Sequence, residues 1–259
     1  MEANAAADFI NALEASGGIV AAVGAGGKKS TLYRLLEAHR IIGTERVLLT
    51  STVQIAAQPK ALEIETHVVE GGDTIAAVDA TDGRDGAFFF AGPSEKPGRY
   101  SGLPEHLIDS VYRRAAFDVA LVKADGARMR MIKAPSENEP ALPDGVSTIL
   151  PIVSARAFGR PLNERIAHRP ERLAQVIDAD IGTALTPDHV AKLLASPEGS
   201  LRRTAEARVV PIINMVDRPE RQAWAEEAAE QALSMTRRFD RVILASMISP
   251  SPLVKIVAG

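Results

Sequence analysis

The sequence predicts an α/β fold with a mostly parallel sheet that is flanked by helices on both faces. Short apolar runs, several rich in β-branched residues, are typical of buried strands, and many of them are separated by segments with helical spacing. This alternation favours a parallel sheet covered on both sides. The expected strands are Ile19 to Val23, Val47 to Leu49, Val119 to Val122, Val146 to Val153, Val209 to Ile213 and Val242 to Leu244, and the expected helices are Ser30 to His39, Pro104 to Ala116 and Glu220 to Thr236.

We expect one P-loop NTPase-like domain over residues 1–259, since 46% apolar side chains in 259 residues suffice for a large core. Residues of about 60–99 contain many Gly turns, which predicts an excursion of short antiparallel strands at the sheet edge. Residues of about 156–200 carry four prolines among short helical patterns. This second segment is expected to be a small helical insertion rather than another βαβ unit.

The composition limits the kinds of partner that the protein can bind and the cellular compartments in which it is expected. A net charge of −3 offers no strong basic field, so we expect neither nucleic acid nor a membrane surface as a partner. The absence of cysteine excludes disulfides and thiolate metal sites. The amino terminus shows no basic segment leading into an apolar core, and no apolar run approaches the roughly 18–20 residues of a membrane span. A cytoplasmic location is therefore expected.

A glycine-rich turn follows the first expected strand and opens the first expected helix. In such a P-loop, backbone N–H groups converge on phosphate oxygens, the helix dipole adds to them, and a lysine reaches the terminal phosphates. The usual pattern has a glycine where Ala22 stands and a hydroxyl directly after the lysine, where Lys29 stands. A plain tight turn is the alternative. The predicted nucleotide-binding residues here are Gly24, Ala25, Gly26, Gly27, Lys28, Lys29, Ser30 and Thr31.

Polar residues also follow the next two strands, whose ends lie at the same sheet edge as the glycine turn. Thr50 and Thr52 follow the second strand, and their hydroxyls are expected to orient phosphate, water or a metal, although Thr and Ser also favour strands and turns. Lys123 and Asp125 follow the third strand. Asp125 is expected to act with Lys28 in catalysis and with Ser30 as a metal ligand, unless it is an ordinary turn residue.

A further pattern, N-x-x-D, follows the strand at Ile212-Ile213. In GTPases an N-K-x-D sequence at this position reads guanine through the aspartate. Asn214 and Asp217 are therefore candidates for base recognition, with Met215 packing on the base in place of the lysine. Capping of the next helix by these two residues is the alternative. The pattern does not decide whether the bound nucleotide is GTP or ATP.

A charged, proline-bounded stretch runs from Lys133 to Pro140. Its lysine and its glutamates, Glu137 and Glu139, are expected either to contact a second ligand or partner protein or to form a solvated loop. Arg169 is similarly a candidate for binding a phosphate or oxyanion, although a surface arginine at a helix start is commoner.

The order of these segments resembles the YqeC-type family, described as accessory proteins of selenium-dependent hydroxylases. The resemblance runs from about Gly18 to Ile256, and its most specific part is the stretch from Asp125-Gly126 through Lys133-Ala134-Pro135 to Glu139-Pro140. Further matching segments are His168-Arg169-Pro170-Glu171, Leu185-Thr186-Pro187, Ser196-Pro197-Glu198-Gly199 and Asn214-Met215-Val216-Asp217. The resemblance implies a P-loop protein that takes part in the maturation of molybdenum hydroxylases, with such an enzyme or its cofactor-maturation machinery as partner.

The sequence departs from the family pattern at three positions. The family reads G-G-K-T, E-A-D-G and N-K-x-D where this chain has Lys29, Lys123 and Met215. The two added lysines attract phosphate and argue against a bound Mg²⁺, which predicts nucleotide binding with slow or no hydrolysis. Two alternatives remain: a P-loop kinase or nucleotidyl transferase acting on a small molecule or cofactor, and a non-catalytic anion-binding scaffold.

Overall fold

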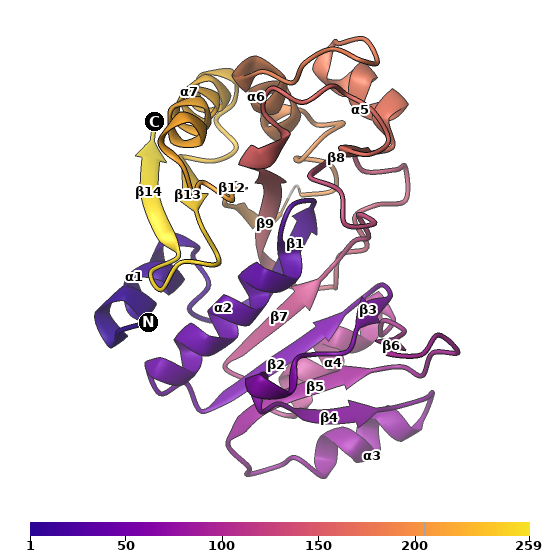
Figure 1. Ribbon diagram of the computed structural model, residues 1–259. Helices are drawn as coiled ribbons and strands as arrows, with labels where there is room; N and C mark the ends of the chain where they lie inside the picture. The colour runs from indigo at the N-terminus through magenta and orange to yellow at the C-terminus, as the bar shows by residue number, and fades with distance from the viewer. Residues whose placement is uncertain (205) are drawn as a thin grey trace. The chain divides into compact units, whose positions relative to one another are not determined.

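The computed structural model describes residues 1–204 and 206–259, and the internal contacts of the chain divide into two compact units (Figure 1). Unit one comprises Met1–Ala22, Leu32–Asp125 and Ala141–Thr148. Unit two comprises Val23–Thr31, Gly126–Pro140 and Ile149–Gly259. The assignment of residues 1–259 to a single domain stays a prediction.

Unit one is built on a parallel sheet with the strand order β1-β7-β2-β5-β4. Every residue of β2 and of β7 is buried, so both faces of this sheet are covered. The strands are β1 (Gly18–Gly24), β2 (Arg46–Ser51), β4 (Glu65–Val68), β5 (Gly86–Ala91) and β7 (Val119–Lys123), and the helices are α1 (Ala3–Ala12), α2 (Lys28–Ile41), α3 (Asp73–Asp79) and α4 (Glu105–Arg114).

The core on one face of this sheet follows from the period of two along the strands. Phe88 and Phe90 of β5 join Leu48 of β2 in one buried cluster, to which α4 contributes Ile108 and Val111. The strands and helices predicted at β1, β2, β7, α2 and α4 are confirmed within a few residues. The short helix α1 was not anticipated.

The segment of residues 60–99 differs in part from the predicted antiparallel excursion. Its strands β4 and β5 pair in parallel with each other, and β5 pairs in parallel with β2, so they extend the main sheet to its edge. Antiparallel pairing is confined to β3 (Ile55–Ala56) with β6 (Arg99–Tyr100). The glycine turns that suggested hairpins flank α3 and its connections instead, because a parallel crossover also needs turns at both ends.

Unit two carries strands in the order β14-β13-β12-β9, with β11 paired to β9. The β9–β12 and β12–β13 pairs are parallel, and β14 is antiparallel to β13. The predicted strand Val209 to Ile213 is split at Pro211, which has no N–H to donate to a ladder. These strands are β9 (Val146–Ser154), β11 (Arg208–Val209), β12 (Ile212–Asn214), β13 (Arg241–Ala245) and β14 (Leu253–Ala258).

The segment of residues 156–200 contains the short helices that were predicted, α5 (Pro170–Ile177) and α6 (Pro187–Ala195). This segment lies in the chain between the neighbouring parallel strands β9 and β12, so these helices are part of the connection that joins the two strands. Helix α6 packs on α7 (Pro219–Met235), and all three helices share one apolar core. A second parallel pair, β8 (Ile132–Lys133) with β10 (Ala167–His168), also belongs to this unit.

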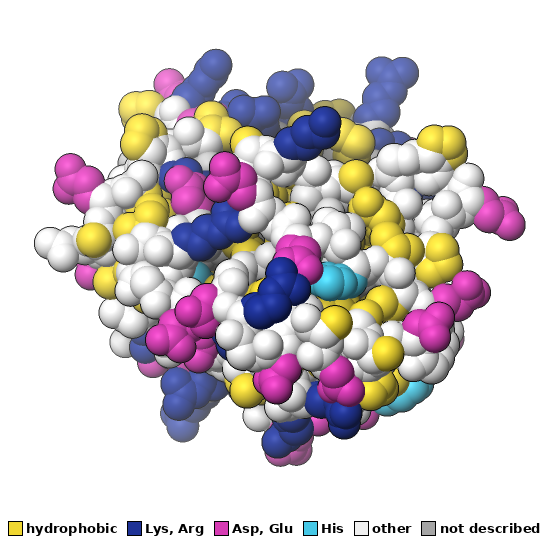
Figure 2. All heavy atoms as spheres, turned by 90° about the horizontal axis from the view of Figure 1, so that it is seen from below, with side chains coloured by type: hydrophobic (Ala, Val, Ile, Leu, Met, Phe, Trp, Pro, Cys, Tyr) yellow, Lys and Arg dark blue, Asp and Glu magenta, His cyan; other side chains and the backbone are white. Residues whose placement is uncertain are grey.

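None of the described helices combines the length and the apolar character that crossing a membrane would require. On the face shown in Figure 2, acidic and basic side chains are interspersed, in keeping with the small net charge of the chain.

Arg46, the first residue of β2, is the most extensively bonded buried cation of unit one. Its guanidinium donates hydrogen bonds to the carbonyl oxygens of Ala115 (3.0 Å), Thr81 (2.9 Å) and Arg84. The ring centroids of Phe88 and Phe117 lie 5.5 and 5.2 Å from its Cζ atom. This one side chain therefore joins the start of β2 to the ends of α3 and α4.

Replacing Arg46 by Met should lower the free energy of unfolding by about 3 kcal/mol, because buried carbonyl oxygens lose a charged donor and cation–π contacts disappear. Urea unfolding followed by circular dichroism measures the change. Arg99→Met, at an exposed position of β6, is the matched control and should shift the midpoint little. An equal loss in both variants would contradict the role given to Arg46.

Candidate functional site

The loop between β1 and α2 is held in a backbone conformation that only glycine adopts readily. Gly24, Gly26 and Gly27 have φ values of 85°, 92° and 134°. A Cβ atom on Gly26 would lie 2.6 Å from the backbone nitrogen of Ser154 and 2.9 Å from the Met131 carbonyl oxygen. A Cβ atom on Gly27 would collide with the side-chain amide of Asn214. The three glycines are therefore required by close packing as well as by backbone angles.

The loop presents a row of backbone amides at the start of α2. The Ala25 amide donates to the Ile152 carbonyl oxygen (2.8 Å), and the Thr31 amide donates to the Gly27 carbonyl oxygen (2.9 Å). Among the described residues, no acceptor receives the amides of Gly26, Gly27, Lys29 or Ser30. Because a helix N-terminus with open N–H groups favours negative charge, this geometry fits a phosphate-binding loop.

Lys28 is the first residue of α2 and is buried. Its ammonium group donates a hydrogen bond to the carbonyl oxygen of Gly24, at the other end of the loop. The side chain is thus folded over the loop, where the ammonium is available to exchange the carbonyl for a phosphate oxygen. The next residue, Lys29, is half-buried, and Ser30 is exposed.

Asn214, at the end of β12, braces this loop. Its side-chain nitrogen donates to the Gly26 carbonyl oxygen (2.8 Å), and its side-chain oxygen accepts from the Met247 amide (3.3 Å). The residue is 1% exposed. A buried amide with both ends bonded fixes the position of the loop, so the structure gives Asn214 a positioning role that the N-x-x-D pattern alone did not indicate.

Asp217, the last residue of that pattern, forms ion pairs with Arg156 (3.2 Å) and Arg221. Partial burial raises the pKa of Asp217, but hydrogen bonds and charge from these two arginines outweigh it and leave the pKa below its usual value. Asp217 lines a cavity of about 510 Å³ together with Ser246 and Ile248 of the segment after β13. The volume of this cavity lies within the range of small-molecule sites and is large enough for a nucleotide base.

Four other predicted site residues belong to unit one, and three of them donate hydrogen bonds to backbone carbonyl oxygens. The Thr50 hydroxyl donates to the Phe90 carbonyl oxygen (2.7 Å), and the Thr52 hydroxyl donates to that of Ala141 (2.8 Å). The Lys123 ammonium donates to the Gln54 carbonyl oxygen (2.8 Å). Asp125 is buried, with 1% exposure. Their roles toward a ligand stay predictions.

Ser30 and Asp125, the predicted metal ligands, lie in different units, so their joint role also stays a prediction. Within residues 1–204 and 206–259, no group of three or more His, Cys, Asp or Glu side chains is placed to hold a metal ion.

The charged stretch from Lys133 to Pro140 is held in place by an ionic cluster of the buried Lys133 with the partly buried Glu139 and Arg169. The Lys133 ammonium lies 3.0 Å from a Glu139 carboxylate oxygen and donates to the Gly126 carbonyl oxygen (2.6 Å). Arg169 lies 2.6 Å from the same carboxylate. Partial burial raises the pKa of Glu139, but Lys133, the Ser136 amide and Arg169 outweigh it and lower the pKa to about 2.

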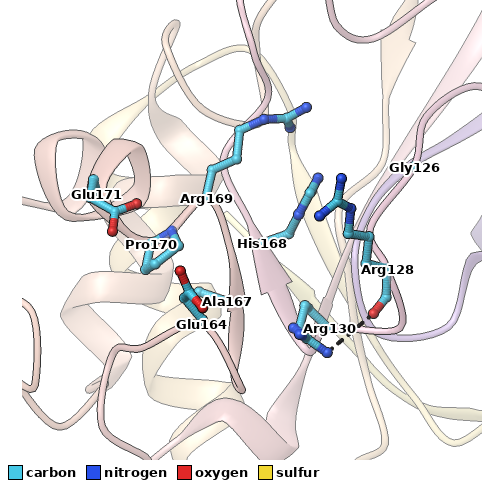
Figure 3. A pocket seen from close by; sticks show the side chains of 9 residues that line it. All are labelled: Gly126, Arg128, Arg130, Glu164, Ala167, His168, Arg169, Pro170 and Glu171. Carbon is cyan, nitrogen blue, oxygen red and sulfur yellow. Dashed lines mark hydrogen bonds between the residues drawn. The ribbon is translucent and has the colours of Figure 1, made fainter.

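A cavity of about 500 Å³ lies beside this cluster and brings together basic residues that the sequence analysis did not single out (Figure 3). Arg128, Arg130 and His168 line it along with Arg169. The signal that would have found the two arginines is their spacing by one residue shortly after Asp125-Gly126, with Ala127 in between. Basic residues in a loop are usually solvated, so the spacing alone does not distinguish a binding site from an exposed turn.

A mostly parallel α/β sheet with a left-handed glycine loop between strand and helix defines the class of proteins with a P-loop NTPase-like fold. The model of one family, described as YqeC protein, matches residues 20–171. The chain therefore belongs to the YqeC family, and the resemblance inferred from its motifs is confirmed. It is also similar to "Uncharacterized protein YqeC" of Escherichia coli (strain K12), with 28% identity over 194 residues that cover 73% of this chain and 72% of the relative.

Replacing Glu139 by Gln should destabilise the protein by roughly 2 kcal/mol at neutral pH, because Lys133 and Arg169 lose their shared anion. The folded-state pKa of Glu139, about 2, lies below the usual glutamate value of 4.5. The stabilisation is therefore complete above about pH 4.5 and is lost as the pH falls toward 2.

Unfolding free energies of both proteins between pH 2.5 and 7 test this prediction. The two curves should converge toward the acid end. Glu137→Gln, in the same loop, is the control and should follow the wild type; a gap between Glu139→Gln and wild type that does not change with pH would refute the ionic explanation.

Proposed function

We propose that this protein binds a nucleoside triphosphate at the glycine loop and acts as an accessory factor in the maturation of a selenium-dependent molybdenum hydroxylase. The observation that carries the nucleotide-binding part is the set of open amides of Gly26, Gly27, Lys29 and Ser30, which lie beside the buried side chain of Lys28. The loop combines the positive end of a helix dipole with N–H donors and one ammonium group. This combination favours a polyphosphate over a neutral ligand.

The brace provided by Asn214 supports this part of the proposal. Because its amide is bonded to the Gly26 carbonyl oxygen and to the Met247 amide, the loop is held open before a ligand arrives. A preorganised loop loses little conformational entropy on binding. The same residue links the loop to the cavity at Asp217, which is where we place the base.

Guanine is the base we favour, since a carboxylate can accept hydrogen bonds from the ring N–H and the amino group of guanine, whereas adenine offers no such pair. The Asp217 carboxylate already forms ion pairs with Arg156 and Arg221. Binding of guanine therefore exchanges at least one of these contacts, which limits the gain in affinity.

Hydrolysis is expected to be slow or absent. Lys29 stands where P-loop NTPases have a hydroxyl that ligates magnesium, and a cation at this position supplies charge without bridging the β- and γ-phosphates. The maturation role rests on the family resemblance, with nucleotide state controlling docking to the client hydroxylase or its cofactor machinery.

Lys28→Ala should weaken the binding of GTP and ATP at least tenfold, because a charge-assisted contact to phosphate contributes about 1.5–3 kcal/mol. Lys29→Ala is the matched control and should retain most of the affinity. Isothermal titration calorimetry with and without magnesium gives both dissociation constants. Equal losses in the two variants would show that the loop does not have the register assigned to it.

Asp217→Ala should abolish a preference for GTP over ATP while leaving the affinity for ATP close to that of the wild type. Competition binding with the two triphosphates measures this ratio. Glu220→Ala, an exposed acidic residue in the first turn of α7, controls for the loss of one negative charge. Equal wild-type affinity for all bases would reject guanine recognition and leave the phosphate site intact.

A further inference from the structure

The cavity beside the Lys133 cluster concentrates positive charge in unit two (Figure 3). Arg128 points toward His168, and the Arg130 guanidinium donates to the Arg128 carbonyl oxygen (3.3 Å). In the part of the chain that the structure describes, neither of these two arginines forms an ion pair with a carboxylate. Both arginines thus line the cavity without a carboxylate partner among the described residues, while Glu164 and Glu171 line it as well.

The pKa of His168 reflects the burial and the charges around this cavity. Burial lowers its pKa, the charges of Arg169, Lys133 and Arg128 lower it further, and Glu139 offsets only part of this, so that its pKa is about 4. The imidazole is therefore neutral at physiological pH and offers one N–H donor and one acceptor. Burial is the largest cause of this shift, and the smaller part that comes from Arg169, Lys133 and Arg128 reflects a positive field, which attracts an anion.

The backbone that carries these arginines is strained. Arg128 and Met129 have φ values of 45° and 60°, and Arg169 has a φ of 61°. Left-handed conformations cost about 1 kcal/mol or more for residues with a Cβ atom, and such strain often marks ligand sites. Two of the arginines at the cavity are thus presented from positions that the chain adopts at a cost.

We propose that this cavity is a second ligand site, distinct in its residues from the glycine loop, and that it binds a small molecule bearing a phosphate monoester. Arg128 and Arg130 hold the phosphate, because planar guanidinium forks match its oxygens. His168 donates a further hydrogen bond to the phosphate. The carboxylates of Glu164 and Glu171, which lie on the side of Pro170, accept hydrogen bonds from hydroxyl or amino groups on the rest of the molecule.

The size and mixed lining of the cavity favour a metabolite over a macromolecule. A volume of about 500 Å³ falls within the range of small-molecule sites. Two carboxylates at the cavity would repel an extended polyanion such as nucleic acid, whereas they suit the uncharged, hydroxyl-bearing part of a phosphorylated metabolite.

Calorimetry on the full chain, with glycerol phosphate and inorganic phosphate as probes, tests the proposal. We expect saturable binding of both. The double variant Arg128→Gln/Arg130→Gln should weaken it at least tenfold, while Arg128→Lys/Arg130→Lys, which keeps the charge but loses the forks, should weaken it less. The control double variant Arg160→Gln/Arg237→Gln removes two exposed arginines of the same unit and should change the affinity less than twofold.

Two further measurements separate this site from the glycine loop. Lys28→Ala should retain glycerol phosphate binding, and the Arg128/Arg130 variants should retain whatever triphosphate affinity the wild type has. The opposite pattern, in which Lys28→Ala loses the monoester and the arginine variants keep it, would overturn the second site. A triphosphate could also displace the monoester in competition. If this displacement is lost when Arg128 and Arg130 are replaced, the cavity belongs to the nucleotide site and the proposal is overturned.

The chemistry of the ligand is tested with malonate, a dianion built from carboxylates. Phosphate-specific geometry predicts clearly weaker binding of malonate than of glycerol phosphate. Equal affinities would overturn the phosphate assignment, and no saturable binding of any of the three probes would overturn the site. Absence of triphosphate binding together with intact monoester binding would reject the proposed nucleotide site and leave this one standing.

Discussion

The side-chain amide of Asn214 is the contact on which the rest of the candidate site depends. Through its two ends it holds the Gly26 carbonyl oxygen and the Met247 amide, and so it joins three loops of unit two. Because the residue is buried, water cannot replace either bond without cost. The amides of the glycine loop and the cavity at Asp217 keep their places relative to each other through this side chain.

The main elements of the fold could be predicted because buried parallel strands leave a strong apolar signal. The runs at β1, β2 and β7 were recognised for this reason, as was the amphipathic helix α4. The parallel direction of β4 and β5 could not be predicted, because glycine turns mark a reversal and a crossover alike. The break at Pro211 is visible in the sequence, but its effect depends on which neighbouring strand needs the missing N–H.

The site was predicted best where a backbone conformation demands a particular residue. Gly24, Gly26 and Gly27 could be found from the sequence because no other residue tolerates their angles and contacts. Charged residues were harder to interpret. The fixed position of Lys133 depends on Glu139, and the cavity at Arg128 depends on the left-handed turn that follows Gly126. The contact that fixes Lys133 leaves no local signal, and the spacing of Arg128 and Arg130 shows only that two cations lie close together, not that they line a cavity.

Each unit contains a buried cationic side chain, and the groups that bind this cation differ between the two units. The guanidinium group of Arg46 is held by neutral carbonyl oxygens and aromatic rings, none of which titrates in acid. Lys133 is held by a carboxylate that does. We therefore expect acid to loosen the region around Glu139 while the start of β2 stays ordered, and amide hydrogen exchange near pH 3 would reveal which region opens first. Acidification would then yield a partly folded form in which the basic cavity has lost its support and the first sheet persists.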